Sequence, residues 1–428
     1  MKFQTKISYQ NTDKYVSFTL YGFLSGLPWV LIFITLSAWL ADVGVSKSLI
    51  GYISWIMLTY SFKFLWAPLI DRFHIPLFSI FGARRSWIIL MQIIIIFCLI
   101  LMSKISPILN FNLFVCVAFI IALAGSIQDI AIDALRIESA ELDDQGNLAA
   151  GYQLGYRIAI LVGSSLALIL AESFSWSYVY NLMSIFLVAN IVLAILISYE
   201  QKNTILEKLT LEDTVRAPLI DFFTRFGFQM ACILLLIVAT YRLTDIVMGP
   251  MANPFYIEMG YTLTEIGAVI KVVGLIFAII GVILGGIFIK TFGLYKSLII
   301  GGLLVMFTNF AFSYASVAEN NLRLLSTIVG LDSLAAGIVG TVNIAFLTSL
   351  VSKKYTGFQY ALLTSLMAIL GKFFGGFSGV LVENLQNLYG FNYGWMSFYI
   401  FTSLLAIPAI LMIFFNKTFF INADNNNN

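Results

Sequence analysis

Long apolar runs follow one another along the chain, each about the length that crosses a lipid bilayer. A membrane-spanning helix needs about 20 predominantly apolar residues, and the sequence contains twelve runs of roughly that length or longer. The runs show no strand-like alternation, and backbone amides in lipid must find their partners within a helix. Twelve transmembrane helices are therefore predicted. They lie over 15–41, 49–70, 86–103, 111–138, 148–171, 176–199, 226–253, 263–289, 295–317, 322–350, 356–382 and 393–415.

Polar segments divide these runs into two equal sets. The longest of them, 200–225, is charged, with six runs before it and six after it. The segments 1–14 and 416–428 are polar tails that we expect in the cytoplasm, and 1–14 lacks the apolar core of a cleavable signal peptide. We therefore predict two six-helix halves, 15–199 and 226–415, joined by a linker. This all-α layout resembles that of major-facilitator transporters.

The distribution of Lys and Arg predicts the orientation in the membrane. With an even number of spans both termini lie on one side, and that side carries fifteen basic loop residues. The opposite side carries only Lys47, Lys104 and Arg323. Because basic loop residues mark the cytoplasmic side, we expect both termini in the cytoplasm.

Composition excludes several classes of protein. Hydrophobic residues make up 60% of the chain and charged residues 11%, whereas soluble domains are nearer half apolar and a quarter charged. The net charge of +2 comes from scattered basic residues, which argues against a nucleic-acid partner. The three cysteines lie in apolar runs without C-x-x-C spacing, and His74 is the single histidine. No metal site or cofactor is therefore expected.

Two carboxylates lie inside the predicted span 111–138. Asp129 and Asp133 are four residues apart, on one helix face, and Arg136 follows three residues later. Charges in a span are costly and usually face a cavity or a partner, so Asp129 and Asp133 are candidates for proton coupling. A purely structural Asp133–Arg136 pair is the alternative. Arg157 lies at a similar depth in the next span, where it can contact Asp129 or bind a substrate carboxylate.

Further charges lie inside the spans of both halves. Arg242 and Asp245 are three residues apart in one span. Six basic against four acidic residues leave the spans at +2, which predicts an anionic, polar substrate. The alternative for some lysines is that they extend to the membrane surface. The basic residues are Lys63, Arg136, Arg157, Arg242, Lys271 and Lys372, and the acidic ones are Asp129, Asp133, Asp245 and Asp332.

Two other patterns suggest a mechanism. Asp71-Arg72, followed by Gly82 and then Arg84-Arg85, resembles the major-facilitator loop motif, which predicts a charge latch; simple membrane anchoring is the alternative. Tyr156 and Tyr241 can stack on a sugar ring. Glycines at four-residue spacing predict close helix packing, either at a sliding interface between the halves or within them. They are Gly22/Gly26, Gly151/Gly155, Gly281/Gly285 and Gly371/Gly375/Gly379.

Several stretches resemble the AmpG family of muropeptide permeases, in family order. They are LWAPLIDR at 65–72, QDIAIDA at 128–134, LGYR at 154–157, EIGAVIK at 265–271 and QYALLTS at 359–365. The resemblance implies a major-facilitator fold in the bacterial inner membrane. It also implies import of N-acetylglucosaminyl-1,6-anhydro-N-acetylmuramyl peptides from periplasm to cytoplasm, driven by the proton gradient without a cofactor, for peptidoglycan recycling.

The resemblance also suggests which residues surround the cargo, and we expect a monomer in the lipid bilayer. Substrate binding is expected at Gln128, Tyr156, Arg157, Arg242, Lys271, Gln359 and Lys372. Proton coupling is expected at Asp129, Asp133 and Asp245, and a gating motif at Asp71, Arg72, Arg84 and Arg85.

Three other functions are left open by the sequence. A transporter of the same fold can carry another anionic metabolite or peptide, such as an acyl-CoA-like or nucleotide-like cargo. A membrane enzyme is disfavoured, because one histidine and no Ser/His/Asp arrangement are present. A non-transporting sensor would tolerate neutralisation of the charges inside its spans.

Overall fold

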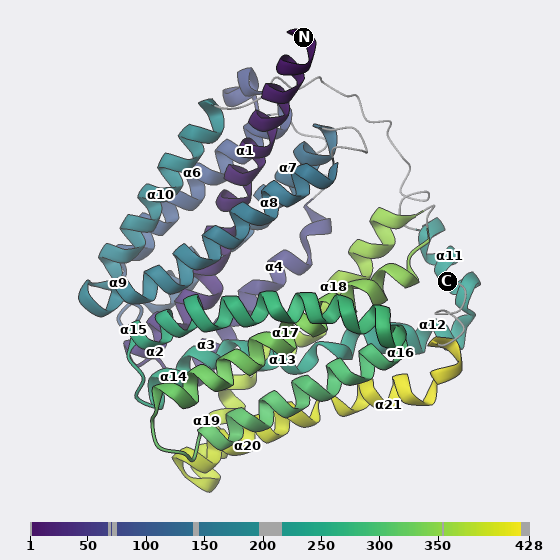
Figure 1. The fold of residues 1–428 in the computed structure, drawn as a ribbon. Coiled ribbons are helices and arrows are strands. Elements are labelled where there is room, and N and C mark those ends of the chain that lie inside the picture. Colours follow the sequence, from purple (N-terminus) through teal and green to yellow (C-terminus); the bar gives the residue numbers. More distant parts are fainter. Residues whose placement is uncertain are drawn as a thin grey trace. The chain divides into compact units, whose positions relative to one another are not determined.

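The computed structural model describes residues 2–66, 70, 75–139, 145–196, 216–352 and 355–420, and every regular element in these ranges is helical (Figure 1). Up to the linker the α-helices are α1 (Lys2–Val30), α2 (Leu36–Asp42), α3 (Lys47–Ile53), α4 (Leu58–Ser61), α6 (Ala83–Lys104), α7 (Phe111–Glu138), α8 (Gln145–Ile160), α9 (Ala167–Ser173) and α10 (Trp176–Leu196). After it they are α11 (Ala217–Phe226), α12 (Phe228–Tyr241), α13 (Leu243–Met248), α14 (Ala252–Glu258), α15 (Leu263–Val269), α16 (Leu275–Ala315), α17 (Leu322–Leu350), α18 (Thr356–Gly375), α19 (Ser378–Tyr389), α20 (Phe391–Leu404) and α21 (Ile407–Phe415).

Shorter turns of other helical types interrupt several spans. The π-helical turns are η1 (Leu31–Thr35), η6 (Leu161–Leu166) and η9 (Ile270–Gly274). The 3₁₀ turns are η2 (Ser54–Met57), η3 (Lys63–Leu65), η4 (Pro76–Phe81) and η8 (Gly249–Met251).

Ten helical segments in the described residues are long and apolar enough to cross a membrane. The difference from the twelve predicted spans has two sources. The segment Leu263–Ala315 joins two predicted spans, and its chain kinks at Gly293, whose φ of 75° is readily adopted only by glycine. The described part of the predicted span 49–70 is divided into α3, η2, α4 and η3, and no single helix in it is long enough. The all-helical, many-span fold is confirmed.

The chain folds into two compact units. Unit 1 consists of Met1–Val45, Ile56–Leu206 and Thr262–Gly267, and unit 2 of Ser46–Trp55, Glu207–Tyr261 and Ala268–Asn428. Most of the predicted linker lies outside the described residues. The units do not follow the predicted halves everywhere, because the first part of span 49–70 clusters with unit 2 and the first part of span 263–289 with unit 1.

Unit 1 is organised around the contact of α1 with α8, two helices that run along each other in Figure 1 (α1 purple, α8 blue). A Cβ atom on Gly155 would lie 1.8 Å from the backbone oxygen of Thr19. On the facing helix, a Cβ atom on Gly22 would lie 2.0 Å from the backbone oxygen of Tyr152. The two backbones therefore touch directly, and only glycine fits at these positions.

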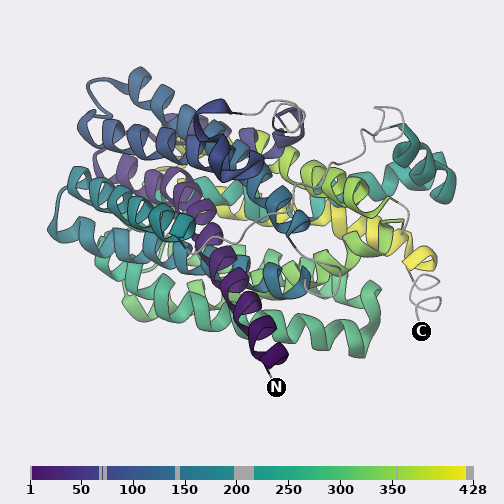
Figure 2. The same ribbon diagram turned by 90° about the horizontal axis from the view of Figure 1, so that it is seen from above.

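Unit 2 contains an equivalent contact between α16 and α17. A Cβ atom on Gly281 would lie 2.2 Å from the backbone oxygen of Leu334, and one on Gly337 would lie 2.5 Å from that of Ala278. The C-terminal helices α20 and α21, yellow in Figure 2, pack against α16 in the same unit. These glycines therefore serve packing within a unit, which was one of the two roles that the sequence left open.

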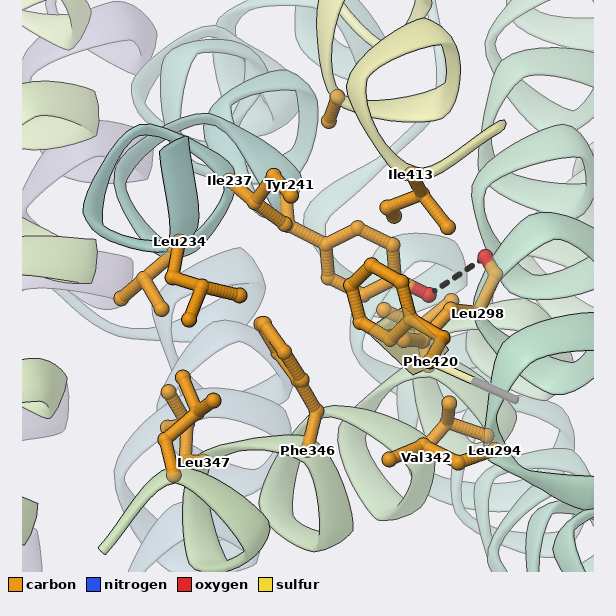
Figure 3. Packing of buried hydrophobic residues seen from close by; sticks show 14 of the residues in the cluster. Leu234, Ile237, Tyr241, Leu294, Leu298, Val342, Phe346, Leu347, Ile413 and Phe420 are labelled. Atoms are coloured by element: carbon orange, nitrogen blue, oxygen red, sulfur yellow. Dashed lines mark hydrogen bonds between the residues drawn. The ribbon is translucent and has the colours of Figure 1, made fainter. Parts of the chain in front are cut away.

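The apolar core of unit 2 gathers around α12, α16 and α17 (Figure 3). Tyr241 is only 5% exposed there, and its hydroxyl donates a hydrogen bond to the backbone oxygen of Leu298 at 2.9 Å. The hydroxyl end of its ring therefore lies among apolar side chains such as Phe346 and Phe420. The suggestion that Tyr241 stacks on a sugar is wrong for this reason.

Helix α3 is fixed within unit 2 by two carboxylates. Lys47 Nζ lies 2.6 Å from Glu258 Oε1, and Glu258 Oε2 accepts a hydrogen bond from Trp395 Nε1 at 2.8 Å. The backbone N–H of Ser48 donates to Glu383 Oε1 at 3.0 Å, and the Ser48 hydroxyl donates to the other oxygen of that carboxylate. The N–H and hydroxyl of Ser48 are therefore satisfied by α19 and the Lys47 ammonium by α14, whose carboxylate is also held by α20.

Candidate functional site

Asp129 lies in α7 of unit 1, where α1 contacts its carboxyl group directly and α8 reaches it through a side chain of α1. The Ser25 hydroxyl on α1 donates a hydrogen bond to Asp129 Oδ1. The Tyr152 hydroxyl on α8 lies 2.8 Å from the same Ser25 oxygen. The close approach of α1 and α8 at their glycines brings Ser25 and Tyr152 together. A chain of two hydroxyls therefore ends on a carboxyl group inside the membrane span.

Aromatic rings from three spans lie around this carboxyl group. Tyr156 on α8 has its ring centroid 6.2 Å from that of Tyr152 and 6.2 Å from that of Trp29. Phe33 lies 5.6 Å from Trp29 and 5.6 Å from Tyr60. All five side chains are partly exposed, so the rings form a continuous arc that a flat, partly apolar ring can contact.

The second carboxylate, Asp133, has a different set of partners. Lys63 Nζ and Arg136 Nη2 each lie 3.6 Å from one of its oxygens. The lysine comes from η3 and the arginine from the next turn of α7. The Asp133 side chain is 38% exposed and that of Lys63 42%, so each ion pair contributes little to stability by itself. Asp133 is therefore held by two cations, whereas Asp129 is held by a hydroxyl group.

The other expected site residues of unit 1 lie close to this cluster but make separate contacts. Gln128 is fully buried, and its amide nitrogen donates to the backbone oxygen of Leu24 at 3.1 Å. Arg157 is exposed, and among the described residues it forms no ion pair with Asp129. The expected Asp129–Arg157 contact is therefore replaced by the Ser25–Asp129 hydrogen bond, which leaves the Arg157 guanidinium available to a ligand.

Unit 2 holds a second group of charges. Arg242 Nη2 lies 3.1 Å from Asp245 Oδ2, as the three-residue spacing predicts. Asp332 on α17 accepts a longer hydrogen bond, at 3.4 Å, from the Thr308 hydroxyl on α16. Lys372 lies in the last turn of α18, and the side chain of Lys271 lies outside the described residues.

Gln359 is the centre of a hydrogen-bonded cluster beside the linker helix α11. Its amide nitrogen donates to the backbone oxygen of Pro218 at 2.8 Å and to Asp221 Oδ2 at 3.0 Å. Its amide oxygen accepts from Arg225 Nη2 at 3.0 Å and from the backbone N–H of Ser352 at 2.7 Å. With 2% of its surface exposed, Gln359 uses both ends of its amide in joining α11 to the start of α18.

Replacing Gln359 by leucine is expected to destabilise unit 2. The change leaves buried polar groups of the linker helix without their partner, at a cost on the order of 2–3 kcal/mol. Thermal unfolding of the purified protein in detergent would show a lower midpoint, whereas Gln153→Leu on the exposed face of α8 should change it little. A Gln359→Leu protein with an unchanged midpoint and lost cargo uptake would instead favour the cargo contact that the sequence suggested.

The loop between α4 and α6 is described only in part. Asp71 and Arg72 lie outside the described residues. The Arg84 guanidinium is buried, with Nη2 lying 2.9 Å and Nε 3.0 Å from Glu138 Oε1 at the end of α7. Arg85 lies beside it at the start of α6. The basic end of the predicted gating motif therefore has an acidic partner, Glu138, that the motif did not predict.

The sequence missed the residues that hold Asp129. Ser25 and Tyr152 are a small and an aromatic residue in otherwise apolar spans, and neither belongs to a charged pattern. Their only signal is the glycine next to each, Gly26 and Gly151, which marks where two helices approach closely. Within the described ranges no group of three or more His, Cys, Asp or Glu residues is arranged to hold a metal ion.

Charged residues within units of membrane-spanning helices fit a solute carrier, and the comparisons with known proteins agree with this class of protein. Residues 18–376 match the profile of the Major Facilitator Superfamily. The solved structure of a bacterial homologue of the human lysosomal transporter Spinster aligns over 97% of this chain and 98% of its own, with a TM-score of 0.72 and 14% identity. That of a D-xylose–proton symporter aligns over 95% and 97%, with a TM-score of 0.68 and 15% identity. These likenesses concern the fold alone.

Closer relatives are found by sequence. The anhydromuropeptide permease of Escherichia coli K12 is 33% identical over 394 residues, which cover 92% of this chain and 77% of that protein. The Rickettsia conorii protein designated AmpG 4 is 34% identical over 406 residues, covering 93% of this chain and 95% of its own. The chain therefore belongs to the Major Facilitator Superfamily and, within it, to the AmpG family. It is a multi-pass membrane transporter of the bacterial inner membrane and not an enzyme.

Proposed function

We propose that this protein imports anhydro-muropeptides, the N-acetylglucosaminyl-1,6-anhydro-N-acetylmuramyl peptides, from periplasm to cytoplasm by alternating access. The observation that carries the proposal is the 33% identity to the Escherichia coli anhydromuropeptide permease over 92% of this chain. The cargo has two sugar rings and peptide carboxylates. The aromatic arc beside Asp129 suits the sugar rings, and the exposed guanidinium of Arg157 suits a carboxylate.

The proposal extends to the energy source and to the orientation. Transport would be driven by the proton gradient with no cofactor, Asp129 would carry the proton, and both termini would be cytoplasmic. Asp129 supports this assignment because its hydrogen-bond partner is a hydroxyl rather than a cation, so its charge is free to change. Asp133 and Asp245 each form an ion pair with a basic residue instead.

The proposed cargo sites divide into two groups. In unit 1, Tyr156 is partly exposed and Arg157 is exposed, and we propose that both contact the cargo directly. Gln128, Arg242, Lys271, Gln359 and Lys372 are further cargo positions that the family resemblance suggests; for Gln359 the hydrogen bonds to α11 favour a structural role instead.

Uptake of labelled anhydro-muropeptide into cells without their own permease tests this function. Cells that express the protein in their membrane are expected to accumulate the label, and a protonophore is expected to abolish the accumulation. Arg157→Ala should raise the concentration for half-maximal uptake, and Arg157→Lys should restore it only in part, since lysine cannot bind a carboxylate in two places at once. If well-expressed protein gives no uptake, the muropeptide assignment fails, and screening with acyl-CoA-like and nucleotide-like anions would follow.

A further inference from the structure

The acidic cluster of unit 1 contains two carboxyl groups, one turn apart, with opposite kinds of partner. Asp133 lies between two cations, Lys63 and Arg136, each at 3.6 Å. Asp129 accepts its hydrogen bond from the neutral hydroxyl of Ser25. A cation stabilises only the ionised form of a carboxyl group, so protonating Asp133 would cost both of its ion pairs. No such penalty applies to the Asp129–Ser25 contact.

A hydroxyl group can serve either charge state of a carboxyl group. It has one hydrogen to donate and two lone pairs that accept. Ser25 can therefore donate to an ionised Asp129 and accept from a protonated one. Tyr152, 2.8 Å from the Ser25 oxygen, can take the complementary role in each case, because either oxygen of that pair can be the donor. The hydrogen bond between Asp129 and Ser25 can therefore form in either charge state of the carboxyl group.

Charged and titratable groups face Asp129 from several neighbouring elements. Among the described residues they are Lys63 from η3, Tyr60 from α4, Tyr152 and Tyr156 from α8, and Asp133 from the next turn of α7. From α1 it receives the Ser25 hydroxyl. In the described residues, α6 and η1, which also pack against α7, present no charged side chain that interacts with it. Lys63 and Asp133 carry opposite charges, so their effects on the Asp129 carboxyl group partly cancel.

We propose that Ser25 and Tyr152 form a hydroxyl chain that keeps Asp129 hydrogen-bonded in both protonation states, so that Asp129 can exchange the transported proton. The inference rests on the proposed proton-coupled function, in which Asp129 carries the proton, and adds the two hydroxyl groups that hold this carboxyl group. The proton passes from periplasmic water to the Asp129 carboxylate and leaves it for cytoplasmic water. Ser25 and Tyr152 only rotate their hydroxyl hydrogens, and neither gains nor loses a proton. They are positioning residues.

An infrared pH titration without cargo tests this chain. The purified protein in liposomes is titrated, and the carbonyl stretch of protonated Asp129 is identified by its loss in Asp129→Asn. Ser25→Ala is expected to move the half-titration point about one pH unit alkaline, because losing a hydrogen bond to a charged acceptor weakens the ionised form more than the neutral form. Tyr152→Phe should move it the same way by less, and Ser25→Thr, which keeps the hydroxyl, should restore it.

Ser126→Ala is the matched control. Ser126 is a buried serine on α7, three residues before Asp129, and its hydroxyl bonds to the backbone oxygen of Leu123 in its own helix. Its removal should leave the titration unchanged, although it removes the same atom.

The outcomes separate this inference from the proposed cargo. If the Asp129 band titrates but Ser25→Ala and Tyr152→Phe leave it in place, the hydroxyl chain is refuted and proton exchange at Asp129 survives. If the wild-type protein is folded but shows no titrating band for Asp129, both the hydroxyl chain and proton exchange at Asp129 are refuted. Shifts as expected in a protein that imports no anhydro-muropeptide support the hydroxyl chain and refute only the cargo assignment.

Discussion

Replacing Asp129 by asparagine is expected to abolish accumulation of the cargo against its gradient. Asparagine keeps the size of the side chain and a hydrogen-bond acceptor for Ser25, but it cannot carry a proton. Each net positive charge that enters with the cargo across about 100 mV is worth about 2.3 kcal/mol, or an accumulation of about 50-fold. Uptake assays should therefore show the internal concentration falling to the external one. Exchange of internal for external cargo, which needs no net proton movement, should survive.

The matched control for this change is Asp42→Asn. Asp42 is a carboxylate of the same unit, at the end of α2, and it accepts a hydrogen bond from Trp176 Nε1 at 2.7 Å. An asparagine can keep that bond, so accumulation should remain near the wild-type value. Accumulation by Asp129→Asn that equals the wild type would contradict the assignment of the proton to Asp129 and would direct attention to Asp332, the acidic residue bonded to Thr308 in unit 2.

Replacing Gly155 by leucine is expected to prevent unit 1 from folding. Any Cβ atom at this position would lie 1.8 Å from the Thr19 oxygen and 2.9 Å from the Phe23 nitrogen. Both are backbone atoms, so no side chain can move aside, and α1 and α8 would have to separate. The loss of stability is expected to be about 3 kcal/mol or more, beyond ordinary overpacking. Size-exclusion profiles of a fluorescent fusion would show loss of the folded, monodisperse peak.

A glycine in a more open place provides the comparison. A Cβ atom on Gly286 in α16 would meet nothing within 4 Å. Gly286→Leu should therefore give the wild-type profile, since the added side chain has open space. A Gly155→Leu protein with a normal profile and melting temperature would mean that α1 and α8 do not touch in the folded protein.

Much of the fold can be predicted from the sequence because membrane insertion depends on long, local apolar runs. Their length and the absence of alternation are enough to predict helices and to place most of their ends. The breaks within the predicted span 49–70 are harder to predict. The turns η2 and η3 interrupt this span, but neither contains a proline, and Lys63 is the one charged residue in them. The grouping of helices was also hidden, because contacts such as those of α3 with Glu258 and Glu383 join residues far apart in the chain.

The site was predictable only where it carries charge. A carboxylate in an apolar span is conspicuous, so Asp129, Asp133 and the Arg242–Asp245 pair were found. Ser25 was not, because a serine in a span is unremarkable, and its contact with Asp129 crosses 104 positions of sequence. Gln359 shows the reverse difficulty: a polar residue in a family motif suggested a ligand contact, whereas its neighbours in space are Pro218, Asp221 and Arg225.

The π-helical turns η1 and η6 have a consequence for how relatives of this chain can vary. They face each other in unit 1, where the Thr35 hydroxyl bonds to the backbone oxygen of Gly163. A π turn holds one residue more than an α turn, so it rotates the helical phase of everything beyond it by about 100°. Trp39 lies beyond η1 and Trp176 beyond η6, and their rings are stacked 5.8 Å apart. A single helical wheel over 15–41 therefore misplaces the residues past η1, and a one-residue deletion in either π turn should be tolerated only with a matching deletion in the other.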